Sequence, residues 1–163
     1  MARRGELDET DLKILNLLRS DARLSFREIG KQIHVSTGTV SERVRQMQDS
    51  GVIKGFVTAI APEKMGYNVT MMLELSVKHE VPLTEFEETL SKFEEAACIH
   101  YVTGDWDMIV LVRCSDQDHA AKLLDRIRTL EAVQAIKSQM VMKSCNLCGQ
   151  CGCDCAWDPA HPK

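Results

Sequence analysis

Residues 69–142 contain six apolar segments whose order restricts the possible fold more than any other feature of this chain. Four of them show the alternating or continuous apolar residues typical of strands, and two show the i, i+3, i+4 spacing of a helix with one buried face. The strand segments are 69–77, 98–103, 108–114 and 135–142, and the helical segments are 82–96 and 116–130. The predicted order is strand, helix, strand, strand, helix, strand.

This order is that of the ferredoxin-like split βαβ fold, in which a four-stranded antiparallel sheet packs two helices on one face. The segment "MIVLV", 108–112, has apolar residues on both sides of the strand. The second face of the sheet must therefore also be covered, most simply by another copy of the chain. We expect an α+β protein that forms at least a homodimer.

The first 60 residues show a different pattern, that of three short helices. Asp8 can cap the first helix, and Ser25 with Glu28 forms a capping box ahead of the second. Ser36 can cap a third helix that turns one apolar stripe inward. Gly30 lies where a small side chain would let the second and third helices touch. Together these features predict a helix-turn-helix unit, whose third helix fits the major groove of B-DNA.

The outward side of the third helix carries small or polar side chains, which can approach base edges closely. These residues are Thr37, Gly38, Thr39, Ser41, Glu42 and Arg45. Arg43 and Arg45, with Arg27 and Lys31 of the preceding helix, can serve the phosphates. The alternative is a three-helix packing unit whose polar face only meets solvent.

A strand over 52–60 is expected to connect this unit to the rest of the chain, because apolar residues precede the turn signals Pro62 and Gly66. Charge also divides the chain near this point. Residues 1–60 hold 10 Lys and Arg against 8 Asp and Glu, whereas residues 61–163 hold 10 against 16. The front of the chain is thus the part whose charge suits DNA.

The stretch "TGDWD", 103–107, connects the two central strands of the predicted sheet. Gly104 permits a positive φ, and backbone amides of such a turn can hold the carboxylate of a zwitterionic small molecule while an Asp holds its ammonium group. The alternative is an ordinary hairpin turn, in which Gly and Asp are the usual residues.

Four fragments of the chain together resemble the Lrp/AsnC family of transcriptional regulators. They are "LDETDLKILNLLRSDARLSFREIGKQI", "VSTGTVSERVRQMQDSGVIKGF", "APEKMG" and "VTGDWDMIVLV", in the family's order, and the resemblance covers about residues 6–143. It implies a winged helix-turn-helix, a linker strand and a βαββαβ effector domain. It also implies dimers formed through the effector-domain sheets, which often associate further into rings.

The resemblance further implies roles for particular residues. Those facing the major groove are Thr37, Gly38, Thr39, Ser41 and Glu42, and those facing the phosphates are Arg43 and Arg45. An amino-acid effector would bind at Gly104, Asp105, Trp106 and Asp107, at a contact between dimers. His34 departs from the family, which usually has Gly there. Since His tolerates the left-handed conformation less well, we expect a turn of different shape.

The last twenty residues carry five cysteines with the spacing C-x2-C-x2-C-x-C-x-C. They are Cys145, Cys148, Cys151, Cys153 and Cys155. In a reducing cytosol such thiols indicate a metal or redox site, and soft thiolates select zinc, copper(I) or an iron-sulfur cluster. The first three match the spacing of ferredoxin cluster ligands, although the fourth does not, and the all-local ligand set is unusual for structural zinc. A disulfide-based redox switch, possible nitrogen ligation by His161 and an unliganded tail stay open. Cys98 and Cys114 are interpreted as core residues.

We therefore divide the chain into a DNA-binding domain with its linker strand over 1–60, an effector and oligomerisation domain over 61–143 and a cysteine-rich tail over 144–163. No stretch approaches the roughly 20 apolar residues that span a bilayer, and the first residues hold no apolar signal segment, so we expect a cytoplasmic protein without a membrane partner.

Our interpretation is a non-enzymatic regulator that binds double-stranded operator DNA and responds to a small molecule, to metal or to redox state. One alternative is an enzyme like the siroheme decarboxylases, which have a similar architecture, with His100, Arg113 and His119 as its candidate residues. Another is a metal carrier with vestigial DNA binding.

Overall fold

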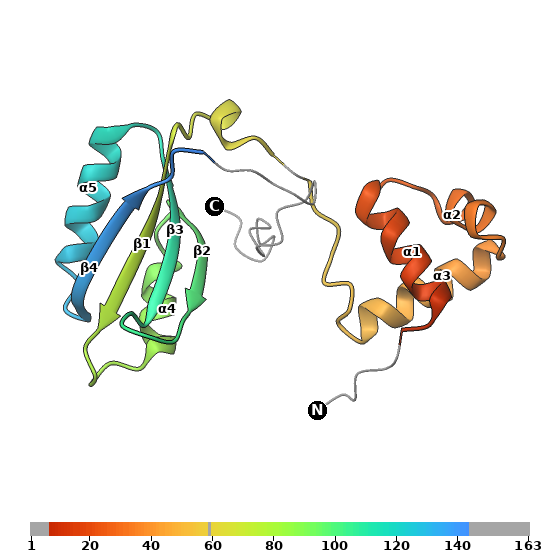
Figure 1. The fold of residues 1–163 in the computed structure, drawn as a ribbon, viewed down its shortest axis with the longest axis horizontal. Coiled ribbons are helices and arrows are strands. Elements are labelled where there is room, and N and C mark those ends of the chain that lie inside the picture. The colour runs from red at the N-terminus through yellow and green to blue at the C-terminus, as the bar shows by residue number, and fades with distance from the viewer. Residues whose placement is uncertain (1–6, 59, 144–163) are drawn as a thin grey trace. The chain divides into compact units, whose positions relative to one another are not determined.

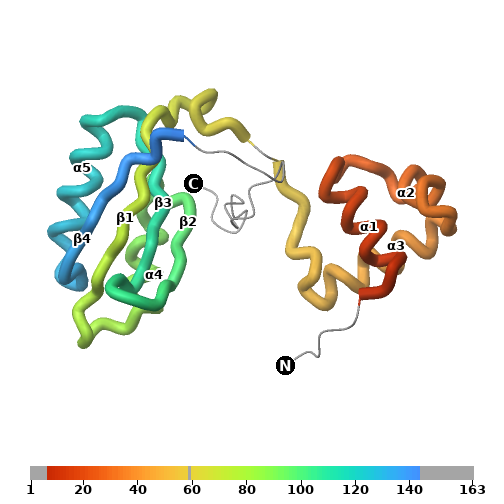
Figure 2. Tube along the Cα trace, in the orientation of Figure 1, coloured from red at the N-terminus to blue at the C-terminus, as the bar shows by residue number. Residues whose placement is uncertain are grey.

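The computed structural model describes residues 7–58 and 60–143. The chain divides into two compact units, Met1–Thr58 and Ala59–Lys163. Each is described by itself below, and Figures 1 and 2 show the path of the chain within each unit.

The first unit is a bundle of three short helices around one small core. The helices are α1 (Glu9–Ser20), α2 (Phe26–Ile33) and α3 (Thr37–Asp49). Ile14, Ile29 and Val40 are completely buried between them. The predicted N-caps are confirmed: Asp8, Ser25 and Ser36 each accept a hydrogen bond from the backbone three residues later, and they satisfy donors that a helix start leaves unpaired.

The turn between α2 and α3 depends on two residues with unusual backbone requirements. A Cβ atom on Gly30 would lie 2.7 Å from the carbonyl oxygen of Val35, so only glycine allows the two segments to approach this closely. His34 ends α2 with φ 60° and ψ 42°, in the left-handed region. The turn therefore keeps a left-handed residue although His stands there, contrary to our expectation, because His is among the non-glycine residues that adopt this conformation.

The predicted strand over 52–60 is wrong for the described part of that stretch, since residues 52–58 form no strand. The three helices of this unit offer no strand edge, and an isolated strand leaves its ladder donors and acceptors unpaired. Val52, Phe56 and Val57 are exposed. A short 3₁₀ helix, Pro62–Met65, follows and ends at Gly66 with φ 90°.

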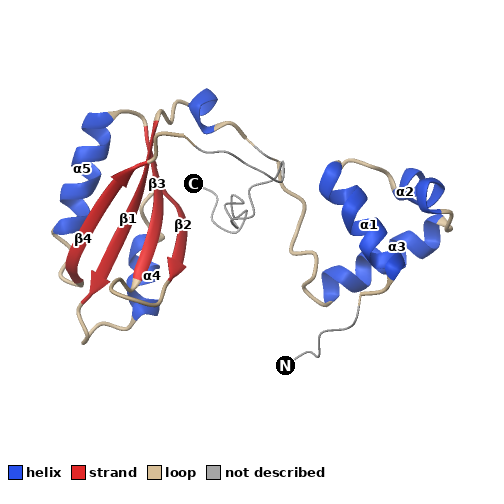
Figure 3. Cartoon of the chain, in the orientation of Figure 1, coloured by secondary structure: helices blue, strands red, loops and turns tan. Residues whose placement is uncertain are grey.

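The second unit is the predicted four-stranded antiparallel sheet with two helices (Figure 3). Its elements are β1 (Val69–Val77), α4 (Leu83–Leu90), β2 (Ala96–Tyr101), β3 (Met108–Cys114), α5 (Gln117–Arg128) and β4 (Val133–Met140). The strand order β2-β3-β1-β4 places the two consecutive βαβ halves in the ferredoxin-like arrangement. Helix α4 is shorter than the predicted 82–96, because Ser91 caps it and turns follow.

Both helices cover the same face of this sheet. Leu73 of β1 and Val110 of β3 are partners in the ladder and are buried under Phe86 of α4 and Leu123 of α5. Strands β1 and β3 alternate between buried and half-buried residues, as expected when only one face lies against helices. The opposite face is open in the single chain and carries half-buried Leu111.

No helix of the described residues is long and apolar enough to span a bilayer.

Candidate nucleic-acid interface and effector turn

The start of α3 presents an unobstructed polar surface. Ser36 Oγ accepts from the Thr39 backbone amide at 3.0 Å and lies 2.8 Å from Thr39 Oγ1, so this first turn is held by its own side chains. A Cβ on Gly38 would have only Ser36 Oγ nearby, at 3.7 Å. The exposed residues here are Thr37, Gly38, Thr39, Ser41 and Glu42. All of the residues predicted to face the groove are thus open to a partner in the single chain.

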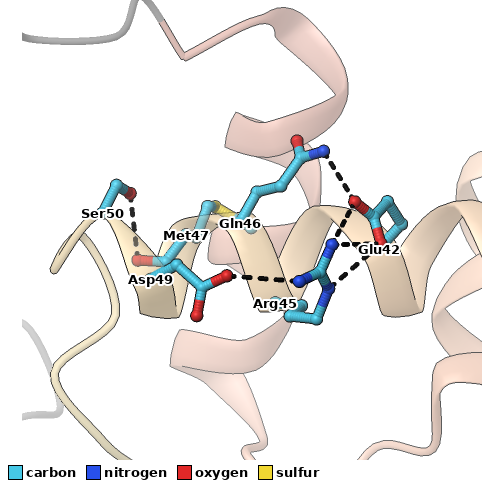
Figure 4. Close-up of polar contacts among 6 residues, drawn as sticks. All are labelled: Glu42, Arg45, Gln46, Met47, Asp49 and Ser50. Atoms are coloured by element: carbon cyan, nitrogen blue, oxygen red, sulfur yellow. Dashed lines mark hydrogen bonds and ion pairs between the residues drawn. The ribbon is translucent and has the colours of Figure 1, made fainter.

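One turn further, Glu42 is the centre of a hydrogen-bonded network (Figure 4). Arg45 binds its carboxylate in a fork, with Nη2 at 2.8 and 3.0 Å from the two oxygens and Nε at 3.2 Å. Gln46 Nε2 donates to the same carboxylate at 2.9 Å, and Arg45 Nη1 lies 3.5 Å from Asp49 Oδ2. Hydrogen bonds from Arg45 and then Gln46 lower the pKa of Glu42. Glu42 is therefore ionised at neutral pH.

Arg43 points sideways from α3 and connects it to the start of α1. Its Nη1 lies 2.8 Å from Asp8 Oδ2 and 3.4 Å from Asp11 Oδ2. Asp11 is buried, and its other carboxylate oxygen has no partner among the described residues. A backbone hydrogen bond from Asp11, assisted by Arg43, lowers the pKa of Asp8. Arg43 thus stabilises the packing of α3 against α1, a tertiary contact that the sequence pattern did not reveal.

Two of the predicted phosphate-binding residues remain outside ion pairs. Arg27 and Lys31 of α2 are exposed, and neither forms a salt bridge with a described residue. By contrast, Arg43 and Arg45 are both occupied within the unit. The cations most available to a phosphate are therefore on α2 rather than on α3.

The turn between β2 and β3 is fixed by one of its own carboxylates. Asp107 Oδ2 accepts from the Val77 amide at 2.8 Å and from Ser76 Oγ at 3.3 Å, which attaches the turn to the end of β1. Gly104 has φ 124°, in the region that favours glycine. Gly104 and Asp105 are exposed and Trp106 is half-buried. Of the two turn carboxylates, Asp105 is the one with no hydrogen bond to a described residue.

A buried polar cluster joins the turn before β2 to α5, and the sequence analysis missed it. Glu95, only 7% exposed, accepts from His119 Nε2 at 3.0 Å and from Arg126 Nη1 at 2.9 Å. The Arg126 guanidinium lies over the Phe93 ring, 4.7 Å from its centre. Burial raises the pKa of Glu95, but the His119 hydrogen bond and the Arg126 charge more than offset this and lower it. The sequence around it, "FEEA" at 93–96, is typical of the polar end of a helix and does not indicate that Glu95 is buried.

The three candidate enzymatic residues do not converge. His119 lies on the helix side of the sheet, bound to Glu95. His100 and Arg113 belong to the opposite, open face, because their ladder positions alternate with buried residues of β3.

The two cysteines that we interpreted as core residues lie in different environments. Cys98 Sγ lies 3.2 Å from His100 Nε2 on the open face and is only half-buried, so it is not a core residue. Cys114 is buried, as expected. Burial raises the pKa of the Cys114 thiol.

The predicted metal ligands Cys145, Cys148, Cys151, Cys153 and Cys155 lie outside the described residues. Within 7–58 and 60–143, no group of three or more His, Cys, Asp or Glu side chains could hold a metal ion.

A helical unit with an exposed, capped third helix and a separate sheet unit with a tight loop are the arrangement expected of a DNA-binding regulator with a ligand domain. Family models agree: a winged helix-turn-helix DNA-binding model matches residues 7–54, and the Lrp/AsnC ligand binding domain matches 68–146. The transcriptional regulator Ptr1 of Methanocaldococcus jannaschii is 35% identical over 142 residues, 85% of this chain and 93% of Ptr1. The chain belongs to the Lrp/AsnC family.

Solved structures agree with this assignment. AsnC of Escherichia coli matches with a TM-score of 0.78 and 27% identity over 84% of this chain and 93% of AsnC. The regulator NMB0573 of Neisseria meningitidis, solved in complex with L-Met, shares the fold with a TM-score of 0.80 and 24% identity over 86% of this chain and 92% of its own. The predicted α+β class is confirmed. The relatives are named transcriptional regulators, so this DNA-binding regulator is not an enzyme, and the decarboxylase alternative is set aside.

Proposed function

We propose that α3 enters the major groove of double-stranded operator DNA and that an amino-acid-type small molecule, bound near the 103–107 turn, modulates this binding. The observation that supports DNA binding is the start of α3, where five of the first six residues are exposed and the sixth, Val40, anchors the helix in a buried core. The residues that would meet the bases are Thr37, Gly38, Thr39, Ser41 and Glu42. An exposed helix start also offers backbone amides to a phosphate.

Phosphate contacts would come from α2 first. Arg27 and Lys31 are exposed and not engaged in salt bridges with the described residues, so they can meet the backbone without breaking a contact. Arg43 and Arg45 were also assigned to the phosphates, but each must first leave a carboxylate. Arg43 would have to weaken the packing between α1 and α3, so we expect it to contribute least to phosphate binding.

Effector binding would use the exposed part of the turn. Asp105 can take the ammonium group of an amino acid, the backbone amides around Gly104 can take its carboxylate, and Trp106 can cover its side chain. Asp107 would position the turn through Val77 rather than touch the ligand. An amino acid is the ligand class we choose because the matching domain is a ligand binding domain and the Neisseria regulator of the same fold was solved with L-Met.

Assembly would use the open face of the sheet. Its apolar side chains, Met72 of β1 with Ile109 and Leu111 of β3, are half-buried in the single chain and suit a second copy of the same face. Larger rings would bring the 103–107 turns of neighbouring dimers together. Replacing Leu111 by Glu should convert the dimer to monomer in analytical ultracentrifugation, whereas Lys122→Glu on the exposed side of α5 should not.

The cysteine-rich tail, 144–163, would add metal or redox sensing to this regulator. Its five thiols within 11 residues suit zinc or an iron-sulfur cluster, and it follows the 61–143 domain directly. Metal analysis and a visible spectrum of the intact protein test this, because an iron-sulfur cluster is coloured and zinc is not. Operator affinity is then measured for the intact protein with and without metal, and for a chain stopped after Lys143. Equal affinity of the intact protein in the two metal states would mean that the tail is at most a structural element.

The function as a whole is tested by binding to DNA from the protein's own promoter over a range of salt. Neutralising Z phosphates gives a slope of about −0.9Z in log affinity against log salt. We expect a steep slope, specific binding that exceeds binding to scrambled DNA, and a shift of affinity with one amino acid. A flat salt response would rule out DNA binding as the function of α3.

A further inference from the structure

The centre of the outward face of α3 is occupied by an ion pair rather than by free cations. Val40, Val44 and Met47 are buried, so the 3.6-residue period places Gly38, Glu42 and Arg45 on the side opposite the core. Of these, Glu42 and Arg45 hold each other in a fork (Figure 4). If α3 docks in the major groove, as the proposed function holds, this pair is what meets the base edges.

An ion pair at this place has a consequence for binding to arbitrary DNA. Glu42 repels phosphates, and Nε and Nη2 of Arg45 cannot form a bidentate contact with a phosphate unless they leave Glu42. Gln46 is held by the same carboxylate. A DNA backbone phosphate would replace the bonds that Arg45 loses but would leave the charge of Glu42 with Gln46 as its one remaining side-chain donor among the described residues. Non-specific binding through this face is therefore penalised.

A G·C base pair satisfies both partners at once. Guanine presents O6 and N7, two acceptors that suit the Arg45 fork, and cytosine presents the N4 amino donor that suits a carboxylate. An A·T pair offers one acceptor and one donor on adenine, which does not match a guanidinium. Exchanging the Glu42–Arg45 hydrogen bonds for bonds to guanine and cytosine therefore gives both the guanidinium and the carboxylate a new partner.

We propose that Glu42 is a specificity-determining residue, which withholds Arg45 from phosphates and, with Arg45, selects a G·C base pair in each half of the operator. Both side chains are largely exposed, at 49% and 65%, so the exchange needs no change in the core. Gln46, released at the same time, is free to bind a neighbouring base.

The test compares the full-length protein with its Glu42→Gln variant on two duplexes, the preferred site selected from a random pool and a scrambled sequence. The variant keeps the side-chain shape and removes the charge. We expect the ratio of scrambled to preferred dissociation constants to fall at least about tenfold, the size of one good base contact. We also expect the salt slope on scrambled DNA to steepen by about 0.9, one phosphate, because Arg45 is released. Circular dichroism checks that the variant folds.

Asp49→Asn is the matched control, because it removes one negative charge from the same face, about 10 Å further along the helix axis. It also removes the 3.5 Å contact with Arg45 Nη1 but leaves the Glu42–Arg45 fork intact. It should strengthen binding to both duplexes alike and leave the ratio unchanged. Substituting each G·C pair of the preferred site in turn should show one pair whose replacement weakens wild type about 10- to 100-fold and weakens the Glu42→Gln variant, which keeps Arg45, by a clearly smaller factor.

Two results would overturn the assignment of Glu42: a variant with the wild-type ratio and the wild-type base-pair profile, or a control that changes the ratio as much as the variant does. A wild-type protein that binds no DNA in a salt-dependent way would instead overturn the proposed function, and the role of Glu42 with it.

Discussion

Two of the described carboxylates, Glu42 and Glu95, each bind an arginine and a second side-chain donor, and they lie in opposite environments. Glu42 pairs with Arg45 and Gln46 on an exposed helix face, whereas Glu95 pairs with His119 and Arg126 and is 7% exposed. Water can replace any partner of Glu42 at little cost, since surface ion pairs contribute little to stability. A buried carboxylate has no such replacement. A carboxylate–arginine pair can therefore exchange its partners for a ligand in the first unit, whereas in the second unit it stabilises the fold.

The largest expected effect comes from removing both partners of the buried carboxylate. His119→Ala with Arg126→Met leaves Glu95 charged and unpaired, and one of its oxygens already lacks a partner among the described residues. We expect a loss of about 3–5 kcal/mol from the unfolding free energy of the second unit, measured by urea denaturation. The matching change on the exposed carboxylate, Arg45→Met with Gln46→Ala, should leave the unfolding midpoint of the first unit where it is. Equal losses of unfolding free energy from the two changes would contradict the difference that we draw between the buried and the exposed carboxylate.

A smaller effect separates packing from recognition within the first unit. Gly30→Ala places a Cβ against the Val35 carbonyl, so we expect a loss of about 1–3 kcal/mol from overpacking. Gly38→Ala meets only Ser36 Oγ, at an ordinary contact distance of 3.7 Å, and replaces a glycine in the first turn of a helix, so it should gain at most about 0.5–1 kcal/mol while it weakens DNA binding. Thermal unfolding and binding to the preferred duplex measure the two quantities. A Gly38→Ala variant that is both more stable and fully active would remove Gly38 from the interface.

Acid sharpens the contrast through the ionisation of Glu95. Its pKa in the folded protein lies below the ordinary value of 4.5, so folding favours the charged form. The stability that Glu95 provides is complete above pH 4.5 and is lost as the pH falls through the folded pKa. The difference in unfolding free energy between wild type and Glu95→Gln should be about 1.5–3 kcal/mol at pH 7 and should shrink in acid. Urea titrations at pH 7 and pH 3.5 measure it, and a difference independent of pH would contradict the account.

Local features of the fold could be predicted from the sequence, whereas tertiary contacts could not. Asp8, Ser25 and Ser36 could be recognised as caps because a cap acts within four residues, and β1 and β3 could be recognised because an alternating or continuous apolar run is itself a local pattern. The partners of Arg43 and the burial of Glu95 depend on residues more than 20 positions away, which no periodicity records. The strand predicted over 52–60 is wrong for residues 52–58 for the same reason. Their apolar side chains favour a strand, but the described part of the first unit offers no strand edge to pair with.

The smallest expected effect concerns His34, where local strain and unfolded-state freedom nearly cancel. Its left-handed backbone costs a non-glycine residue about 1–2 kcal/mol, which His34→Gly would recover. Glycine also makes the unfolded chain more flexible, which costs about 0.4–1 kcal/mol in the other direction. We expect a net gain of about 0.5 kcal/mol in thermal unfolding of the first unit. His34→Val should lose stability, because a β-branched residue is least tolerant of positive φ. A His34→Gly variant less stable than wild type would mean that the imidazole itself stabilises the turn between α2 and α3, and that this turn, like Glu95, is held by a tertiary contact.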